Sequence, residues 1–182
     1  MLDNYSRQKQ EIKTIRKRTL RLKLSDADCK RLAELCGGHG LTVEELIENF
    51  IGDLVNGTYS NGSDERMYAR QWFKRCWFGM FPEETFLYYL ITSGYICDVL
   101  ELWDSIQNGK EELDEVKRNP MEYEPEEERF IREDIEYFQT QIDTYWSEYF
   151  VMNTEYKKGT FEEEMKKVLD WNERLNQLLA AD

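Results

Sequence analysis

Basic side chains alternate with leucines in a short stretch near the N-terminus. Residues 18–24 read Arg-Thr-Leu-Arg-Leu-Lys-Leu, so an extended chain carries leucines on one side. The opposite side carries Thr19, Arg21 and Lys23, with Arg18 at the start of the stretch. Because a basic two-stranded ribbon fits the major groove of DNA, this pattern predicts duplex DNA as a partner.

A strand at residues 18–24 cannot stand alone. A single strand of this length leaves its backbone edges unpaired and its leucines exposed. The same strand from a second copy is the simplest partner, and we therefore expect a homodimer through residues 18–24. In the alternative interpretation, the strand lies at the edge of the chain's own fold and its basic side is merely solvated.

Carboxylates are the second group that could do chemistry. Residues 98–136 hold fifteen Asp and Glu against five Lys and Arg, whereas residues 1–31 hold ten basic against four acidic residues. Carboxylates repeated along helices can imitate the phosphates of DNA and occupy a basic channel. The candidate partner-binding residues are Glu126, Glu127, Glu133 and Glu136. The alternative is an ordinary solvated helix face.

No motif of an enzyme is present in the sequence. It contains no Gly-rich phosphate loop, no nucleophile elbow and no His/Cys set with the spacing of a metal site. His39 is the single histidine and lies in a Gly-rich turn, and the four cysteines are far apart. We expect no catalytic residue, no metal and no cofactor, so the chain is predicted not to be an enzyme.

A third pattern mixes aromatic and basic residues at 68–81. Arg70, Lys74 and Arg75 are interleaved there with Tyr, Trp and Phe. Such a mixture can bind single-stranded nucleic acid. Aromatic residues at helical spacing more often form a core, which is the interpretation that the sequence favours here.

The elements that must position these residues are nearly all helices. Apolar residues recur at helical spacing after the first strand, and they predict a mostly α fold. The predicted helices are 26–36, 42–55, 65–79, 82–93, 95–107, 110–118, 125–150 and 160–178. The sequence thus predicts that the chain is divided into three parts: a basic flexible arm at 1–17, a strand-helix-helix module at 18–57 and an acidic, aromatic-rich helical bundle at 64–182.

The strand, its Ser25 cap, a helix of about ten residues, a Gly turn and a second helix capped by Thr42 resemble the ribbon-helix-helix family of DNA-binding proteins. The resemblance covers roughly residues 18–56. It implies that the outward strand side chains read base edges and that Thr42, at the start of the second helix, contacts a phosphate. The Gly-Gly-His-Gly turn at 37–40 departs from the usual one.

A wider resemblance covers residues 20–93. The segments LTVEELIENFIGDLV (41–55), YSNGSDER (59–66) and WFKRCWF (72–78) resemble accessory proteins on mobile elements of gut Firmicutes, one group of which consists of type II-A anti-CRISPR proteins. This resemblance implies a non-enzymatic inhibitor of the guide-RNA-loaded type II CRISPR nuclease. A DNA-binding regulator of the mobile element is the alternative. With no signal peptide or membrane span in the sequence, we expect the protein in the cytoplasm of a bacterial host cell.

Overall fold

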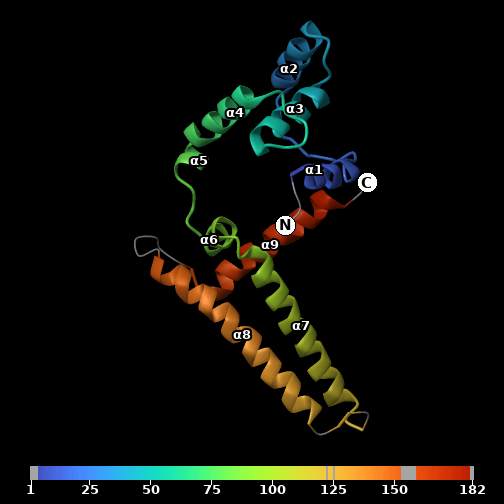
Figure 1. Ribbon diagram of the computed structural model, residues 1–182, viewed down its shortest axis with the longest axis vertical. Coiled ribbons are helices and arrows are strands. Elements are labelled where there is room, and N and C mark those ends of the chain that lie inside the picture. The colour runs from blue at the N-terminus through green and yellow to red at the C-terminus, as the bar shows by residue number, and fades with distance from the viewer. Residues whose placement is uncertain (1–3, 122, 125, 153–158, 181–182) are drawn as a thin grey trace. The chain divides into compact units, whose positions relative to one another are not determined.

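The computed structural model describes residues 4–121, 123–124, 126–152 and 159–180, and these form helices joined by loops (Figure 1). The helices are α1 (Asn4–Lys13), α2 (Asp26–Gly38), α3 (Val43–Val55), α4 (Ser63–Arg75), α5 (Trp77–Met80), α6 (Phe86–Ser93), α7 (Ile96–Arg118), α8 (Glu127–Met152) and α9 (Phe161–Leu179). The chain divides into two compact units, Met1–Pro82 with Leu175–Asp182, and Glu83–Arg174. The mostly helical fold is confirmed.

The predicted strand is not present. In the part of the chain that the structure describes there is no strand, and residues 18–24 lie in an irregular segment in which every residue is exposed. A single chain offers this segment no neighbouring strand to pair with, so the alternation of leucines is not sufficient to form a sheet by itself. The one-strand ribbon-helix-helix module is therefore not supported.

The N-terminal arm also differs from its prediction. Residues 4–13 form α1, whereas the sequence predicted a flexible arm over residues 1–17. Long polar side chains such as Gln, Glu, Lys and Arg dominate this segment, and their good helix propensity offsets the weak apolar periodicity.

Side-chain caps fix the starts of several helices. The hydroxyl of Ser25 accepts a hydrogen bond from the Asp28 backbone N–H, and Thr42 and Glu45 form a complete capping box at α3. These two caps satisfy backbone donors that have no partner inside a helix. Both starts are confirmed.

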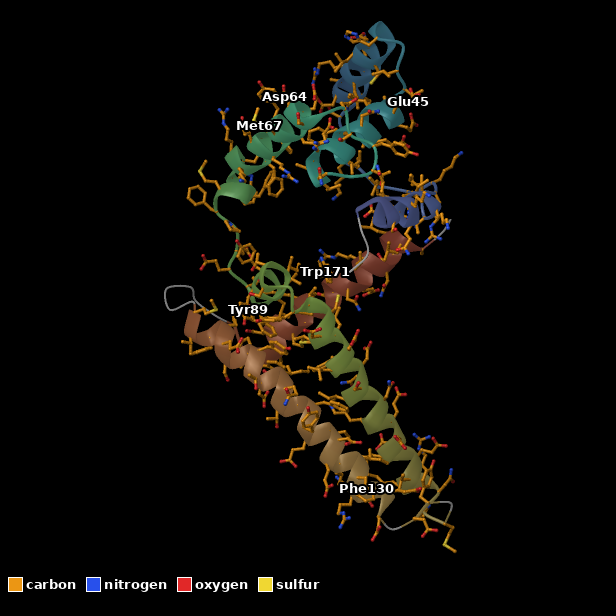
Figure 2. All side chains as sticks on the ribbon, viewed as in Figure 1. Glu45, Asp64, Met67, Tyr89, Phe130 and Trp171 are labelled. Atoms are coloured by element: carbon orange, nitrogen blue, oxygen red, sulfur yellow. The ribbon has the colours of Figure 1, made fainter. Side chains whose placement is uncertain are left out.

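The second unit has a continuous apolar core. Its fully or almost fully buried side chains come from α6, α7, α8 and α9: Phe86, Tyr89, Leu90, Val99, Tyr149, Met165 and Val168. Rings of this cluster pack against one another, with Phe86 and Trp146 edge to face at 5.3 Å between centroids. Figure 2 shows Tyr89 on α6 in this region. This core holds the helices that carry the acidic residues.

Helices α7 and α8 form a long antiparallel pair (Figure 1). The sequence predicted a break at Asn108-Gly109, but α7 continues through both residues. A Cβ on Gly109 would lie 2.8 Å from the Cγ1 atom of Ile135 on α8, so the missing side chain permits close approach of the two helices. Apolar residues recur every three or four positions along α8 and form an apolar seam that is buried or half-buried: Ile131, Ile135, Phe138, Ile142, Tyr145 and Tyr149.

In the first unit, the loop after α3 folds back onto that helix. The buried carboxylate of Asp53 accepts hydrogen bonds from the backbone and side-chain N–H groups of Asn61, at 2.7 and 2.9 Å. A Cβ on Gly52 would lie 1.9 Å from the carbonyl oxygen of Tyr59. The boundary predicted between residues 57 and 64 therefore lies inside the first unit, where α3 also packs on α4.

Candidate partner-binding surfaces

The predicted acidic residues lie at and near the start of α8. Glu126, Glu127, Glu133 and Glu136 are all exposed. The Glu127 carboxylate accepts a hydrogen bond from the Glu124 N–H at 3.0 Å, and Glu133 pairs with Arg129 at 3.6 Å. Within the described residues, the carboxylates of Glu126 and Glu136 have no partner. The four side chains thus present negative charge to solvent.

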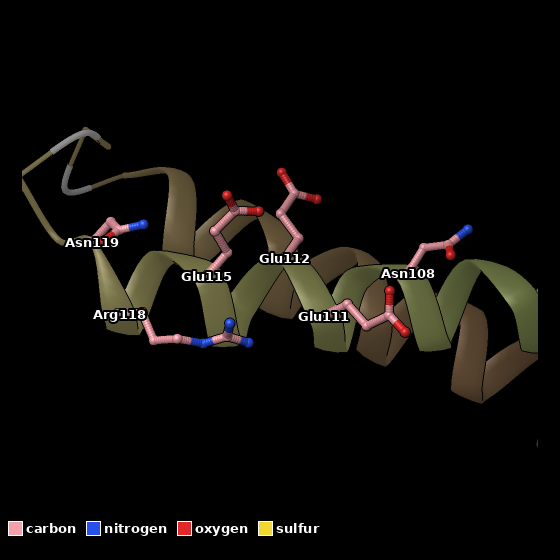
Figure 3. A pocket seen from close by; sticks show the side chains of 6 residues that line it. All are labelled: Asn108, Glu111, Glu112, Glu115, Arg118 and Asn119. Atoms are coloured by element: carbon pink, nitrogen blue, oxygen red, sulfur yellow. The ribbon is translucent and has the colours of Figure 1, made fainter.

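The second half of α7 extends this acidic surface. A shallow hollow there is lined by polar side chains only: Asn108, Glu111, Glu112, Glu115, Arg118 and Asn119. Figure 3 shows the carboxylates of Glu112 and Glu115 projecting on the same side of the helix. The Arg118 Nε donates to the backbone carbonyl of Asp114 at 3.1 Å. The α7–α8 pair therefore carries exposed carboxylates on both helices.

The predicted DNA-reading side chains are exposed but are not all available. Arg18 donates hydrogen bonds to the carbonyls of Leu179 and Ala180, at 2.7 and 3.2 Å, and Arg16 also donates to Leu179. The last turn of α9 has no basic residue of its own, so these guanidinium groups satisfy its unpaired carbonyls. This contact, which we call the arginine clamp, was not predicted, and no local sequence pattern indicates it.

Thr19, Arg21 and Lys23 are exposed on the segment that precedes α2. In the described part of the chain, the charged groups of Arg21 and Lys23 make no ion pair or hydrogen bond. Of the basic residues at 18–24, these two remain open to an anionic partner.

Thr42 has a structural role that competes with phosphate binding. Its hydroxyl accepts from the Glu45 N–H at 3.1 Å, and its own N–H donates to the Glu45 carboxylate at 2.7 Å. That backbone bond lowers the pKa of the Glu45 carboxyl. A carboxylate therefore already occupies the position that the resemblance assigns to a DNA phosphate.

The aromatic segment at 68–81 does not form a core. Trp77 is 76% exposed and Phe81 71% exposed, while Trp72, Phe73 and Phe78 are each at least 40% exposed. The prediction of a core was wrong for this segment: α4 packs on α3 and α5 packs on α4, and most of their aromatic side chains remain exposed.

Potential metal ligands do not converge in the described residues, where no group of three or more His, Cys, Asp or Glu side chains could hold an ion. Cys36 is buried, while Cys29 and Cys97 are exposed. Across the same residues, no helix combines the length and apolar character needed to cross a membrane.

Comparison with protein-family models, with curated proteins and with solved structures finds no match to this chain.

Proposed function

We propose that this chain is a non-enzymatic inhibitor of a guide-RNA-loaded type II CRISPR nuclease in a bacterial cytoplasm. In this proposal the acidic α7–α8 pair engages the basic surface on which the nuclease holds nucleic acid, and blocks target DNA binding or cleavage. The sequence resemblance suggests the partner, and the acidic surface suggests how it is bound.

The observation that carries the proposal is the exposure of carboxylates on a packed pair of helices. Residues 98–136 have a net charge of −10 from fifteen acidic and five basic residues, and none of the four candidate glutamates is buried. Apolar packing between α7 and α8 fixes the spacing of the helices without using these charges. Such a surface suits electrostatic recognition of a cationic channel.

A cleavage assay tests the proposal. The intact chain is added to guide-loaded nuclease before labelled target DNA, and target binding and cut product are both measured. We expect inhibition by the wild type, and weaker inhibition by the E126Q/E127Q/E133Q/E136Q variant. Undiminished cleavage and target binding at saturating wild-type protein would contradict the proposal.

A matched variant controls for net charge. Glu34, Glu48, Glu162 and Asp170 are also exposed helical carboxylates, and their change to Gln or Asn removes the same total charge. This control is expected to inhibit like the wild type, because its substitutions lie outside the proposed contact surface.

The second candidate is a dimeric DNA-binding regulator, favoured by the exposure of Leu20, Leu22 and Leu24 together with Arg21 and Lys23. We propose that residues 18–24 pair with the same segment of a second copy, which would cover the leucines and form a basic ribbon.

Sedimentation and gel-shift measurements test this second candidate. Leu22→Asp should convert a dimer into a monomer, and Arg21→Glu with Lys23→Glu should abolish binding to duplex DNA. A wild type that is monomeric at micromolar concentration would contradict the ribbon. DNA binding without any effect on the nuclease would instead favour this candidate over the inhibitor.

A further inference from the structure

The surface of α4 and α5 combines exposed aromatic rings with positive charge, and neither proposed function uses it. From Arg66 to Phe81 the sequence contains six aromatic residues, four Lys or Arg and no acidic residue, in a chain whose net charge is −13. We propose that this surface, the α4–α5 platform, binds single-stranded nucleic acid by base stacking and phosphate pairing.

Several rings of the α4–α5 platform contact one another. Phe73 and Phe78 pack at 5.3 Å between centroids, and Trp77 and Phe78 at 5.8 Å. A Cβ on Gly79 would lie 2.1 Å from the carbonyl oxygen of Phe73, so only glycine lets α5 lie this close to the end of α4. A pre-ordered platform loses little side-chain entropy when a base stacks on it.

Basic side chains lie next to these rings. Arg70 and Lys74 are four residues apart and therefore share one face of α4, beside Phe73. Both are exposed. Figure 2 shows Met67 and Asp64 nearer the start of the same helix. Charge complementarity thus favours an anionic partner that also presents planar apolar groups, which describes an unpaired polynucleotide.

The ring orientations favour single strands over other anionic partners. Neighbouring rings are turned by 61° between Phe73 and Phe78 and by 76° between Trp77 and Phe78. Rings that face different directions suit separate, unstacked bases, whereas insertion into a lipid surface needs one continuous apolar face. Bases inside a duplex are stacked on each other and present no free face to an aromatic ring.

Fluorescence anisotropy of the intact chain tests the inference. The probes are short labelled oligothymidylate and oligouridylate, a duplex of the same length, and phosphatidylserine–phosphatidylcholine vesicles. We expect binding to one or both single strands. Trp77→Ala with Phe81→Ala should weaken it about fivefold or more, although no charge is removed. Arg70→Gln with Lys74→Gln should reduce the salt slope by about 1.4.

Two control variants separate oligonucleotide binding by the α4–α5 platform from binding by other aromatic or basic residues of the chain. Phe130→Ala with Tyr137→Ala removes two exposed aromatic side chains of α8 and should leave oligonucleotide affinity unchanged. Arg21→Gln with Lys23→Gln tests the basic segment. Oligonucleotide affinity that survives loss of Trp77 and Phe81, or that disappears with Arg21 and Lys23 alone, would overturn the inference. Binding to vesicles but not to either single strand would overturn it in favour of a membrane surface.

Discussion

Glu164 and Phe86, 78 residues apart in the sequence, are joined by a hydrogen bond of 2.9 Å in which the Phe86 backbone N–H donates to the Glu164 carboxylate. Glu164 is 1% exposed and also pairs with Lys167 at 2.5 Å. The carboxylate of α9 thereby satisfies an unpaired donor at the start of α6. The hydrogen bond therefore connects α6 and α9, two of the helices that form the core of the second unit.

Replacement of Glu164 by Ala should destabilise the second unit. The change leaves a buried N–H without an acceptor, at a cost of about 1–3 kcal/mol in the free energy of unfolding. Glu164→Gln keeps an acceptor oxygen and should cost less. Urea denaturation measures both, with the exposed Glu162→Ala as a control that stays within about 0.5 kcal/mol of the wild type. Equal stability of the Ala variant and that control would disprove the role of this bond.

Tyr89 should make stability sensitive to alkaline pH. Burial, and then its hydrogen bond of 2.8 Å to Glu148, raise the pKa of the Tyr89 hydroxyl above that of an unfolded tyrosine, about 10. The folded protein therefore favours the neutral Tyr89 hydroxyl more than the unfolded chain does. This preference stabilises the fold below about pH 10, and the stabilisation is lost as pH rises further. Burial and Asp98 raise the pKa of Tyr145 as well.

Tyr89→Phe should therefore cost about 1 kcal/mol at neutral pH and flatten the loss of stability above about pH 10. Urea midpoints measured from neutral to strongly alkaline pH give the two curves, and the exposed Tyr137→Phe serves as control. Parallel curves for wild type and Tyr89→Phe would show that Tyr89 does not carry this dependence.

Two glycines of the first unit should respond oppositely to alanine. At Gly52 a Cβ would collide with the backbone of Tyr59, whereas at Gly37 on α2 it would meet nothing within 4 Å. Gly52→Ala should displace the loop after α3 and increase its proteolysis. Gly37→Ala should stabilise the unit by about 0.4–1 kcal/mol through loss of unfolded-state freedom. The same proteolysis rate in both variants would contradict the observed close approach.

The arginine clamp should protect the end of α9. Arg16→Ala with Arg18→Ala removes the donors to the last carbonyls, so exchange of the Ala180 amide, which bonds to Asn176, should accelerate roughly two- to fivefold. Hydrogen exchange measures this directly. Arg21→Ala with Lys23→Ala is the control and should leave the exchange rate of the Ala180 amide unchanged. Unaltered exchange in the clamp variant would mean that the helix end is held by other contacts.

Most helices could be predicted because their signals are local. Ser25 and Thr42 cap the next turn themselves, and the seam from Ile131 to Tyr149 repeats every three or four residues. The predicted break at Asn108-Gly109 failed because packing of Gly109 against Ile135 overrides the weak helix propensity of Gly. No local pattern reveals that α8 supplies that neighbour.

The candidate surfaces were less predictable. The exposure of Glu126, Glu127, Glu133 and Glu136 agrees with their position off the apolar seam, whereas their contact with a partner stays a prediction. The alternating leucines at 20–24 predicted a strand that a single chain does not form. The aromatic residues at 68–81 have the same helical spacing whether they are buried or exposed. Burial of Trp77 depends on whether another helix packs against it, and the local sequence does not reveal this.

The association rate between the intact chain and guide-loaded type II CRISPR nuclease tests the central proposal most directly. Surface plasmon resonance at about 50 and 200 mM salt should show fast, salt-sensitive association for the wild type, because charge steers encounter over a Debye length that falls from about 14 Å to about 7 Å between these salt concentrations. The E126Q/E127Q/E133Q/E136Q variant should associate about tenfold more slowly at low salt and depend less on salt. No association by the wild type, or an unchanged rate for the folded variant, would contradict the proposal that the acidic α7–α8 pair engages the nuclease.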